Sequence, residues 1–444
     1  MRRVNITDFV AALLGVFVGL PTLFFPFGRD QGLYYYIGRE WFLRGAIPYR
    51  DMLEHKTPGI FVVHGLAIRI FGEHMWSIRV VELAAVVAMG LAAAYAATPM
   101  RSRVPPGLRG IGVLGACLLY FGFFNFWDSA QCEIWVVVFV MFAFAAIARV
   151  RHPIVAAAIA GTACGLALVM KPAIFFLPVC AVVLLRRERV ARLRVGLVFA
   201  ATSAVPWLIV LSYFAAAGSS SALFDLLGGA NRHYLTHEPG VDGPVEVFAR
   251  SIGVIRIYGP LGAALSWGCI VAGRRASKRR DVATRDAYLL VLALTCAAYA
   301  IIFSQMKFYF YHWGVVLLPM TLAVTTFARD AWHFAIRCGR RRTFGAIFIA
   351  STVGLYLTTM ASEFLWFMEA KHVLLYETGK MSRDEFGNFF RVDILGFNER
   401  DDHAVAEWLR ANSSPNDRVA VRGFEPEIYA ESGRTYGGRF FWTL

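Results

Sequence analysis

Long apolar runs recur along this 444-residue chain and limit what it can fold into. Most are roughly 17–25 residues long, the length of α-helix that crosses a ~30 Å hydrocarbon core. A hydrophobic share of 57% and a charged share of only 17% exclude an ordinary soluble domain. We therefore expect an all-α polytopic membrane protein with about eleven spans, near residues 9–27, 76–98, 110–126, 132–149, 153–170, 172–186, 195–217, 251–273, 286–304, 313–328 and 343–366.

The distribution of basic residues predicts the orientation of these spans. Arginines and lysines gather in alternate loops, which is the positive-inside pattern and places the N-terminus in the cytoplasm. With an odd number of spans, the C-terminus lies outside. The same pattern accounts for the formal net charge of +14, so we expect no nucleic-acid partner. The basic groups lie near 2–3, 101–109, 149–151, 186–194, 274–285 and 337–342.

One segment between the first two spans, Gly28–Met75, differs from the short loops elsewhere. Two helix-compatible patterns, Gln31–Arg44 and Pro58–Phe71, are separated by the break at Gly45–Pro48. Their apolar faces and few charges favour helices that lie in the membrane interface. The segment also packs ionisable groups among aromatic ones beside a bilayer, where their desolvation is costly. Such a cluster is a functional-site hypothesis.

Two residues of this segment offer chemistry, each with a structural alternative. Asp30 can accept a proton from a hydroxyl as a general base, or it can N-cap the first interfacial helix. Lys56, followed by Thr-Pro, places a cation at a helix start, where free N–H groups bind phosphate. The alternative is a lysine that reaches lipid headgroups. One histidine, His55, beside two carboxylates is a weak metal signal.

The ordered motifs of this segment resemble the large first loop of GT-C glycosyltransferases. The resemblance is greatest to the branch of aminoarabinose transferases, protein O-mannosyltransferases and rhizobial galacturonosyltransferases. The family pattern reads approximately D-E-G-x-Y, G-x-x-P-Y-x-D and K-P-P. Here Gln31 replaces the usual glutamate and Thr57 the first proline of the last motif. The matching motifs are Asp30-Gln-Gly-x-Tyr34, Gly45-x-x-Pro48-Tyr49-x-Asp51, Lys56-x-Pro58, Phe71-Gly72 and Arg79.

Later motifs extend the resemblance over nearly the whole chain. The segment Ser129–Glu133 looks like the family's second acidic site, with Asp128 as the competing candidate. Lys171-Pro172 matches its lysine at an outer helix end. Gln305–His312, followed by Pro319, matches its K…YH…P segment. Ser432-Gly-Arg434 and Arg439-Phe resemble its tail.

The resemblance implies a GT-C type A fold with a transmembrane catalytic domain, 1–366, and a small extracytoplasmic α/β segment, 367–444. In the tail we expect a helix from Asp402 to Ala411 and a strand from Arg418 to Val421. The chain ends at Leu444 without a turn signal, so we expect a shortened C-terminal module.

The resemblance also implies the reaction. Such enzymes move a sugar from a polyprenyl-phosphate donor to a lipid, glycan or protein acceptor at the outer face of the bacterial inner membrane, usually with inversion. Asp30 is the implied general base. The implied donor-phosphate ligands are Lys56, Lys171, Lys307 and His312. Implied substrate contacts are Tyr34, Tyr49, Asp51, Asp128, Glu133 and Tyr311. Glu133 or Asp128 is also a candidate ligand for a divalent cation, Mg²⁺ or Mn²⁺; no metal site is assigned.

Other interpretations remain beside this one. Lys171 and Lys307 are also typical of lysines that anchor a helix at the membrane interface. The tyrosines are also typical of an interfacial aromatic belt. A transporter or flippase of envelope precursors is the main alternative function, but it favours repeated halves and midplane charges, and neither pattern is visible. An O-antigen ligase or polymerase carries its main outer loop later in the chain. A non-catalytic partner protein is a further alternative, if glutamine in place of the usual glutamate at position 31 means that the activity has been lost.

Overall fold

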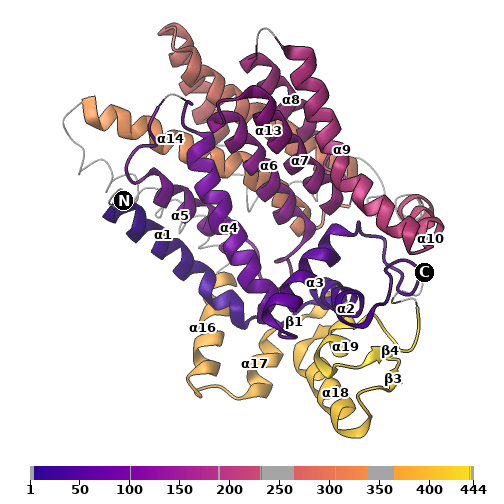
Figure 1. The fold of residues 1–444 in the computed structure, drawn as a ribbon. Helices are drawn as coiled ribbons and strands as arrows, with labels where there is room; N and C mark the ends of the chain where they lie inside the picture. Colours follow the sequence, from indigo (N-terminus) through magenta and orange to yellow (C-terminus); the bar gives the residue numbers. More distant parts are fainter. Residues whose placement is uncertain are drawn as a thin grey trace.

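The computed structural model describes residues 5–100, 102–188, 191–230, 232, 265–305, 307–337, 365–439 and 441. Helices dominate this part of the chain (Figure 1). Within the described residues, seven helical segments are long and apolar enough to cross a membrane. One of them is formed by α1 with the 3-10 turn η1, and another by η3 with part of α14. Their elements are α1 (Ile6–Gly19), η1 (Leu20–Phe24), α4 (Trp76–Ala96), α6 (Cys132–Arg149), α7 (Pro153–Met170), α9 (Arg192–Ala216), α13 (Val282–Gln305), η3 (Phe310–Val316) and α14 (Leu317–Arg337).

The remaining expected spans have two outcomes. Those near 110–126 and 172–186 form the shorter helices α5 (Leu108–Phe121) and α8 (Phe176–Arg187). Those near 251–273 and 343–366 lie largely outside the described residues, although 265–278 is helical. The all-α polytopic fold is therefore confirmed, while the total of eleven spans stays a prediction.

Small residues bring the helices α7 and α9 close together. A Cβ atom at Gly161 would lie 2.5 Å from the Phe199 carbonyl oxygen, and one at Gly165 would lie 2.4 Å from that of Ser203. Only glycine allows this backbone approach, as is common where membrane helices pack. Helix α7 ends at Met170, and the backbone of the next residue, Lys171, is extended. A residue before proline disfavours the helical conformation, and Pro172 thus explains the end.

The first outer segment contains the two expected helices. Helix α2 (Arg29–Arg44) ends at Gly45, whose φ of 72° is left-handed, and α3 (Gly59–Phe71) begins after Pro58. In Figure 1 both lie at the same end of the bundle as the C-terminal tail. This end of the bundle carries the residues discussed below.

The tail packs against α2. It contains the expected helix as α18 (Glu399–Asn412) and a shorter strand than expected, β3 (Arg418–Val419), which pairs in parallel with β4 (Thr435–Tyr436). The buried Arg39 of α2 donates hydrogen bonds to the carbonyl oxygens of Tyr429 (3.1 Å) and Arg434 (3.0 Å). The domain boundary after residue 366 stays a prediction. The remaining elements are α10 (Ser220–Phe224), the π-helix η2 (Asp225–Ala230), α16 (Leu365–Glu377), α17 (Arg383–Phe389), β1 (Arg391–Val392), η4 (Asp393–Leu395), β2 (Phe397–Asn398) and α19 (Pro426–Ser432).

Candidate active site

Asp30 lies in the first turn of α2, half-buried. Its carboxylate accepts no hydrogen bond from the described residues, and it interacts electrostatically with Tyr34, Lys56 and Asp128. The alternative that Asp30 caps the helix is wrong, because Gly28 is the N-cap. The carboxylate is therefore placed among polar groups from three segments and remains able to accept a proton.

Lys56 lies in the turn before α3, close to two neighbours in sequence. Its Nζ is 3.0 Å from Nε2 of His55 and 3.9 Å from Oε1 of Glu54. Burial alone lowers the pKa of Lys56, but the carboxylates of Glu54 and Asp30 outweigh it, so the pKa is raised. The lysine thus stays protonated and points inward instead of reaching the lipid headgroups.

The turn that carries Lys56 is attached to the end of α7. Thr57 Oγ1 donates a hydrogen bond to the carbonyl oxygen of Met170 (2.6 Å), the residue before Lys171. The hydroxyl of the buried Tyr49 donates to the carbonyl oxygen of Lys56 (2.8 Å). These bonds place two lysines from distant parts of the sequence near each other. Tyr49 therefore stabilises the backbone of the turn that carries Lys56.

Lys171, Lys307 and His312 complete a cluster of basic side chains around Lys56. Lys171 forms an ion pair with the buried Glu133 at the start of α6. The buried His312 of η3 interacts electrostatically with Lys56, Lys171 and Lys307. Lys307 is only 3% exposed, which excludes an interface anchor. Four segments therefore bring the predicted phosphate ligands together, and we call Asp30, Lys56, Lys171, Lys307 and His312 the lysine cluster.

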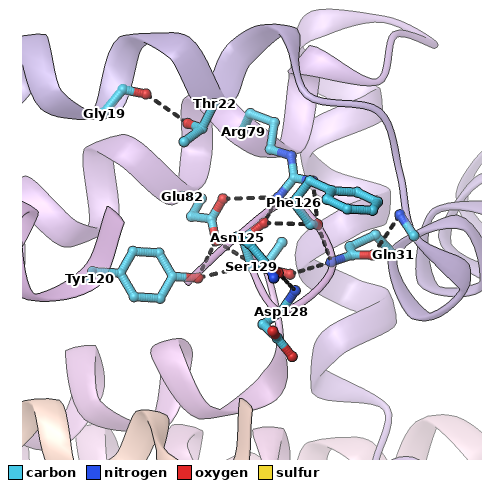
Figure 2. A network of polar contacts seen from close by, with 12 residues as sticks. Gly19, Thr22, Gln31, Arg79, Glu82, Tyr120, Asn125, Phe126, Asp128 and Ser129 are labelled. Atoms are coloured by element: carbon cyan, nitrogen blue, oxygen red, sulfur yellow. Dashed lines mark hydrogen bonds and ion pairs between the residues drawn. The ribbon is translucent and has the colours of Figure 1, made fainter. Parts of the chain in front are cut away.

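The loop between α5 and α6 supplies Asp128, whose side chain points away from the network around Gln31 (Figure 2). Asp128 is buried, and its burial, together with the charges of Asp30 and Glu133, raises its pKa to about 7. Both predicted candidates for the second acid thus interact with the lysine cluster. They differ because Glu133 is paired with Lys171, whereas Asp128 is close to protonation at neutral pH.

Gln31 supports this loop instead of replacing a catalytic acid. Its buried Nε2 lies within hydrogen-bonding distance of the carbonyl oxygens of Phe126 (3.0 Å), Trp127 (2.8 Å) and Ser129 (2.6 Å). Figure 2 shows Gln31 beside Phe126 and Ser129. A glutamate here would face three acceptors without a proton to donate. The departure from the family pattern therefore has a structural reason, and it does not indicate lost activity.

The other predicted contacts divide into two groups. The hydroxyl of Tyr34 donates to Gln131 Oε1 (3.2 Å), and the Tyr311 ring packs against His312 with centroids 4.7 Å apart. Both border the lysine cluster. Asp51 is not brought there: it pairs with Arg50, and that pairing outweighs partial burial to lower the pKa of Asp51. Its expected role in substrate binding stays a prediction.

Groups of three metal-ligating side chains lie elsewhere in the described part of the chain. Within the described residues, two such groups have ligand atoms within 4.8 Å of one another, and both lie in the tail. Asp30, Asp128 and Glu133 form no such group. A divalent cation at the lysine cluster therefore stays a prediction, and we derive no catalytic step through it.

A family profile decides the class of protein. The profile of glycosyltransferase family 87 matches residues 60–304, more than half of the chain. The protein belongs to glycosyltransferase family 87. It is a multi-pass membrane glycosyltransferase, and the transporter alternative has no support.

Comparison with solved structures gives matches to this family 87 member at low sequence identity. ArnT from Cupriavidus metallidurans, bound to undecaprenyl phosphate, is 15% identical with a TM-score of 0.52, over 97% of this chain and 85% of ArnT. Archaeal oligosaccharyltransferase AglB from Archaeoglobus fulgidus, with an inhibitory peptide and a dolichol-phosphate, is 13% identical with a TM-score of 0.47. That match covers 98% of this chain and 64% of AglB. A comparison with curated proteins gave no match.

The motifs included Arg79, but sequence reasoning missed Glu82 and Tyr120, which lie with it behind the candidate site. Glu82 of α4 accepts hydrogen bonds from the Tyr120 hydroxyl and the Ala130 amide, and Arg79 donates to Ser129 Oγ. Figure 2 shows these groups around the loop that carries Asp128. The available signal was the Arg-x-x-Glu spacing inside an apolar run, where ionisable residues are rare and mostly functional.

Backbone strain marks the same loops of the family 87 protein. Non-glycine residues rarely adopt positive φ angles, and such strain gathers at functional sites. Three of the four described examples are Tyr49 (68°), Ala130 (55°) and Phe308 (52°). They lie in the segments that carry Lys56, Asp128 and Lys307. The strain is maintained by the hydrogen bonds of Tyr49 and of the Ala130 amide.

Proposed function

We propose that the protein transfers a sugar from a polyprenyl-phosphate donor to a hydroxyl group of a lipid, glycan or protein acceptor. The observation that carries this proposal is the convergence of one unengaged carboxylate, Asp30, with three lysines and His312. A phosphate that leaves the anomeric carbon needs cations, and the acceptor hydroxyl needs a base. The undecaprenyl phosphate bound to ArnT, which has a similar fold, supports the choice of donor.

Asp30 acts as the general base in this reaction. Its carboxylate removes the proton from the acceptor hydroxyl while that oxygen forms a bond to the anomeric carbon. The bond from this carbon to the phosphate oxygen breaks on the opposite face, so the configuration inverts. The proton remains on Asp30, and the electron pair leaves with the polyprenyl phosphate. Asp30 lies in the first turn of α2 and is half-buried, so part of its side chain remains accessible.

The lysines hold and stabilise the leaving phosphate. Lys56, Lys171 and Lys307 come from separate segments and therefore can surround an anion from several sides. Charge-assisted hydrogen bonds to phosphate are about twice as strong as neutral ones. Glu54 lies beside Lys56, and Glu133 pairs with Lys171, so two of these lysines are held in place by carboxylates. Donor binding exchanges part of this pairing for phosphate contacts.

The orientation follows from charge. The lysine cluster lies at one end of the bundle, and arginine-rich loops such as the one containing Arg149 and Arg151 lie at the other. The positive-inside tendency favours a cytoplasmic location for the arginine loops. We therefore place the active site and the tail outside the bacterial inner membrane, with the N-terminus in the cytoplasm.

The substitution Asp30→Asn tests the proposal. It keeps the shape of the side chain but removes the base, so kcat should fall by about 10²–10⁴-fold. Binding of polyprenyl phosphate to the purified protein should persist, because the lysines are intact. Asp393→Asn, at an exposed tail position, is the matched control and should transfer sugar normally. Undiminished transfer by Asp30→Asn would remove Asp30 from the role of base.

A further inference from the structure

A second group of ionisable residues lies where the tail meets α2. Asp402 of α18 and the residues Glu425 and Glu427 at the start of α19 direct carboxylate oxygens to one place. One oxygen from each lies within 4.8 Å of the others. We call these three residues the tail acid group. Like charges this close repel each other unless a cation or a proton lies between them.

The positive charge beside the tail acid group is too small to balance it. Arg29 Nε donates to Glu425 Oε2 (2.8 Å), and Arg29 Nη1 donates to the carbonyl oxygen of Leu395 (2.9 Å). The same guanidinium interacts electrostatically with Glu427 and Asp402. One cation among three carboxylates leaves the ionised group with an excess of negative charge.

Glu427 gives independent support, because its buried oxygens lack donors. The residue is 2% exposed, and neither Oε1 nor Oε2 has a hydrogen-bond partner in the part of the chain described; the same holds for Oδ2 of Asp402. Asp402 and Glu427 nevertheless face each other at hydrogen-bonding distance. Ionised carboxylates only accept hydrogen bonds. A buried, ionised carboxylate without a donor is costly, and a bound cation or a proton shared between Asp402 and Glu427 would remove this cost.

We propose that the tail acid group binds a divalent cation, with Ca²⁺ as the metal that fits best. Ca²⁺ takes six to eight oxygen ligands, including carboxylates and waters, in flexible geometry. The absence of cysteine and histidine from the three disfavours zinc. The second group of possible metal ligands in the tail consists of Glu399, His403 and Glu431. It differs from the tail acid group because Arg383 pairs with Glu399 and His403 Nδ1 lies 2.8 Å from Glu431.

The cation joins the tail to the helix that carries Asp30. A Cβ atom at Gly32 would lie 2.7 Å from the backbone nitrogen and Cα of Glu427, so the two backbones touch. Gly32 is two residues after Asp30. A metal between Asp402 and Glu427 therefore holds α18 and α19 together against the first turn of α2. This role is separate from sugar transfer and is tested without it.

Calorimetric titration of the purified full-length protein with CaCl₂, after removal of metals with EDTA, tests the proposal. We expect Kd of about 10⁻⁴–10⁻³ M, as in extracellular calcium modules, and a rise of Tm on binding. Asp402→Asn and Glu427→Gln should each weaken binding by about 10-fold or more. Both remove repulsion, so their Tm without metal should equal or exceed that of the wild type.

Asp401→Asn is the matched control. It removes the same charge at the preceding position of α18, where the side chain is 60% exposed, and should leave Ca²⁺ binding unchanged. Three results would overturn the proposal: no binding of Ca²⁺ or Mg²⁺ by the wild type; equal binding by Asp402→Asn and Glu427→Gln; or loss of binding in Glu431→Gln alone. A Tm that depends on pH but not on Ca²⁺ would show a shared proton instead.

Discussion

The lysine cluster and the tail acid group lie at the same end of the molecule but differ in the sign of the charge that their side chains can bind. In the lysine cluster, Glu133 pairs with Lys171, and Glu54 lies beside Lys56. In the tail acid group, three carboxylates share Arg29. The first arrangement has basic side chains ready for an anion, whereas the second leaves buried oxygens that suit a cation. The balance of partners, rather than the number of charges, therefore distinguishes the two regions.

The largest effect is expected when a buried carboxylate beside the lysine cluster loses its cationic partner, as in the tail acid group. Lys171→Met leaves Glu133 buried without its cation. Breaking a buried pair in this way costs about 3–5 kcal/mol of stability. The affinity for polyprenyl phosphate should also fall by about 10–100-fold, because a charge-assisted hydrogen bond is lost. Denaturation curves and binding of polyprenyl phosphate measure the two effects.

Lys380→Met removes an exposed tail lysine and is the control for Lys171→Met. Neither stability nor donor affinity should change in that variant. If Lys171→Met is as stable as the wild type and binds donor equally well, Glu133 and Lys171 do not form the balanced pair described here.

A smaller effect is expected when an acid without a cation is introduced beside the lysine cluster. Gln31→Glu places a carboxylate against the carbonyl oxygens of Phe126, Trp127 and Ser129. We expect a loss of about 1–3 kcal/mol in stability, the cost of unsatisfied buried polar groups, and weaker sugar transfer as the Asp128 loop shifts. Gln31→Met loses the hydrogen bonds without adding charge. Equal melting temperatures for the two variants would show that charge is not the cause.

An effect that depends on pH is expected at Asp128, whose pKa resembles that of the tail residue Asp402. Burial raises the pKa of both to about 7. For Asp128, the folded protein holds a proton between about pH 4 and 7 that the unfolded chain releases. Stability from this group is therefore present below pH 4 and is lost as pH rises to 7.

Asp128→Asn removes this dependence. Its Tm relative to that of the wild type should rise between about pH 4 and 7 and then level off. Because one pKa unit corresponds to about 1.4 kcal/mol, the rise of the Asp128 pKa to about 7 limits this difference in stability at pH 8 to at most about 4 kcal/mol. Thermal unfolding across this pH range measures it. A constant difference between the two proteins would mean that Asp128 is ionised throughout.

Much of the fold was predictable because bilayer thickness restricts helices to a narrow length. Helices α6 and α7 begin and end at the predicted residues, and Pro172 stops the second of them. Glycine at position 45 marked the end of α2 in the same local way. The tail strand was predicted too long, since its length depends on the pairing of Arg418 with Thr435 from a later segment.

The candidate site was only partly predictable. Spacing and resemblance indicated Asp30, Lys56, Lys171, Lys307 and His312, which the fold brings together. The supporting residues Glu82 and Tyr120 escaped notice because their importance depends on contact with the Ala130 amide. Asp51 shows the reverse: its motif suggested the site, yet its carboxylate accepts a hydrogen bond from the Ile47 amide (2.8 Å) and pairs with Arg50.

The sequence alone determined the membrane class, the helical positions and the chemical types of the candidate residues, because hydrophobic length, proline, glycine and charge act locally. Only the tertiary structure decided which acid meets which cation. The partners of Lys171, Gln31 and Arg29 are distant in sequence, and Coulomb energy depends on distance and burial instead of on order along the chain. For this reason only the structure distinguishes the lysine cluster, whose charges are paired, from the tail acid group, whose carboxylates outnumber their cation.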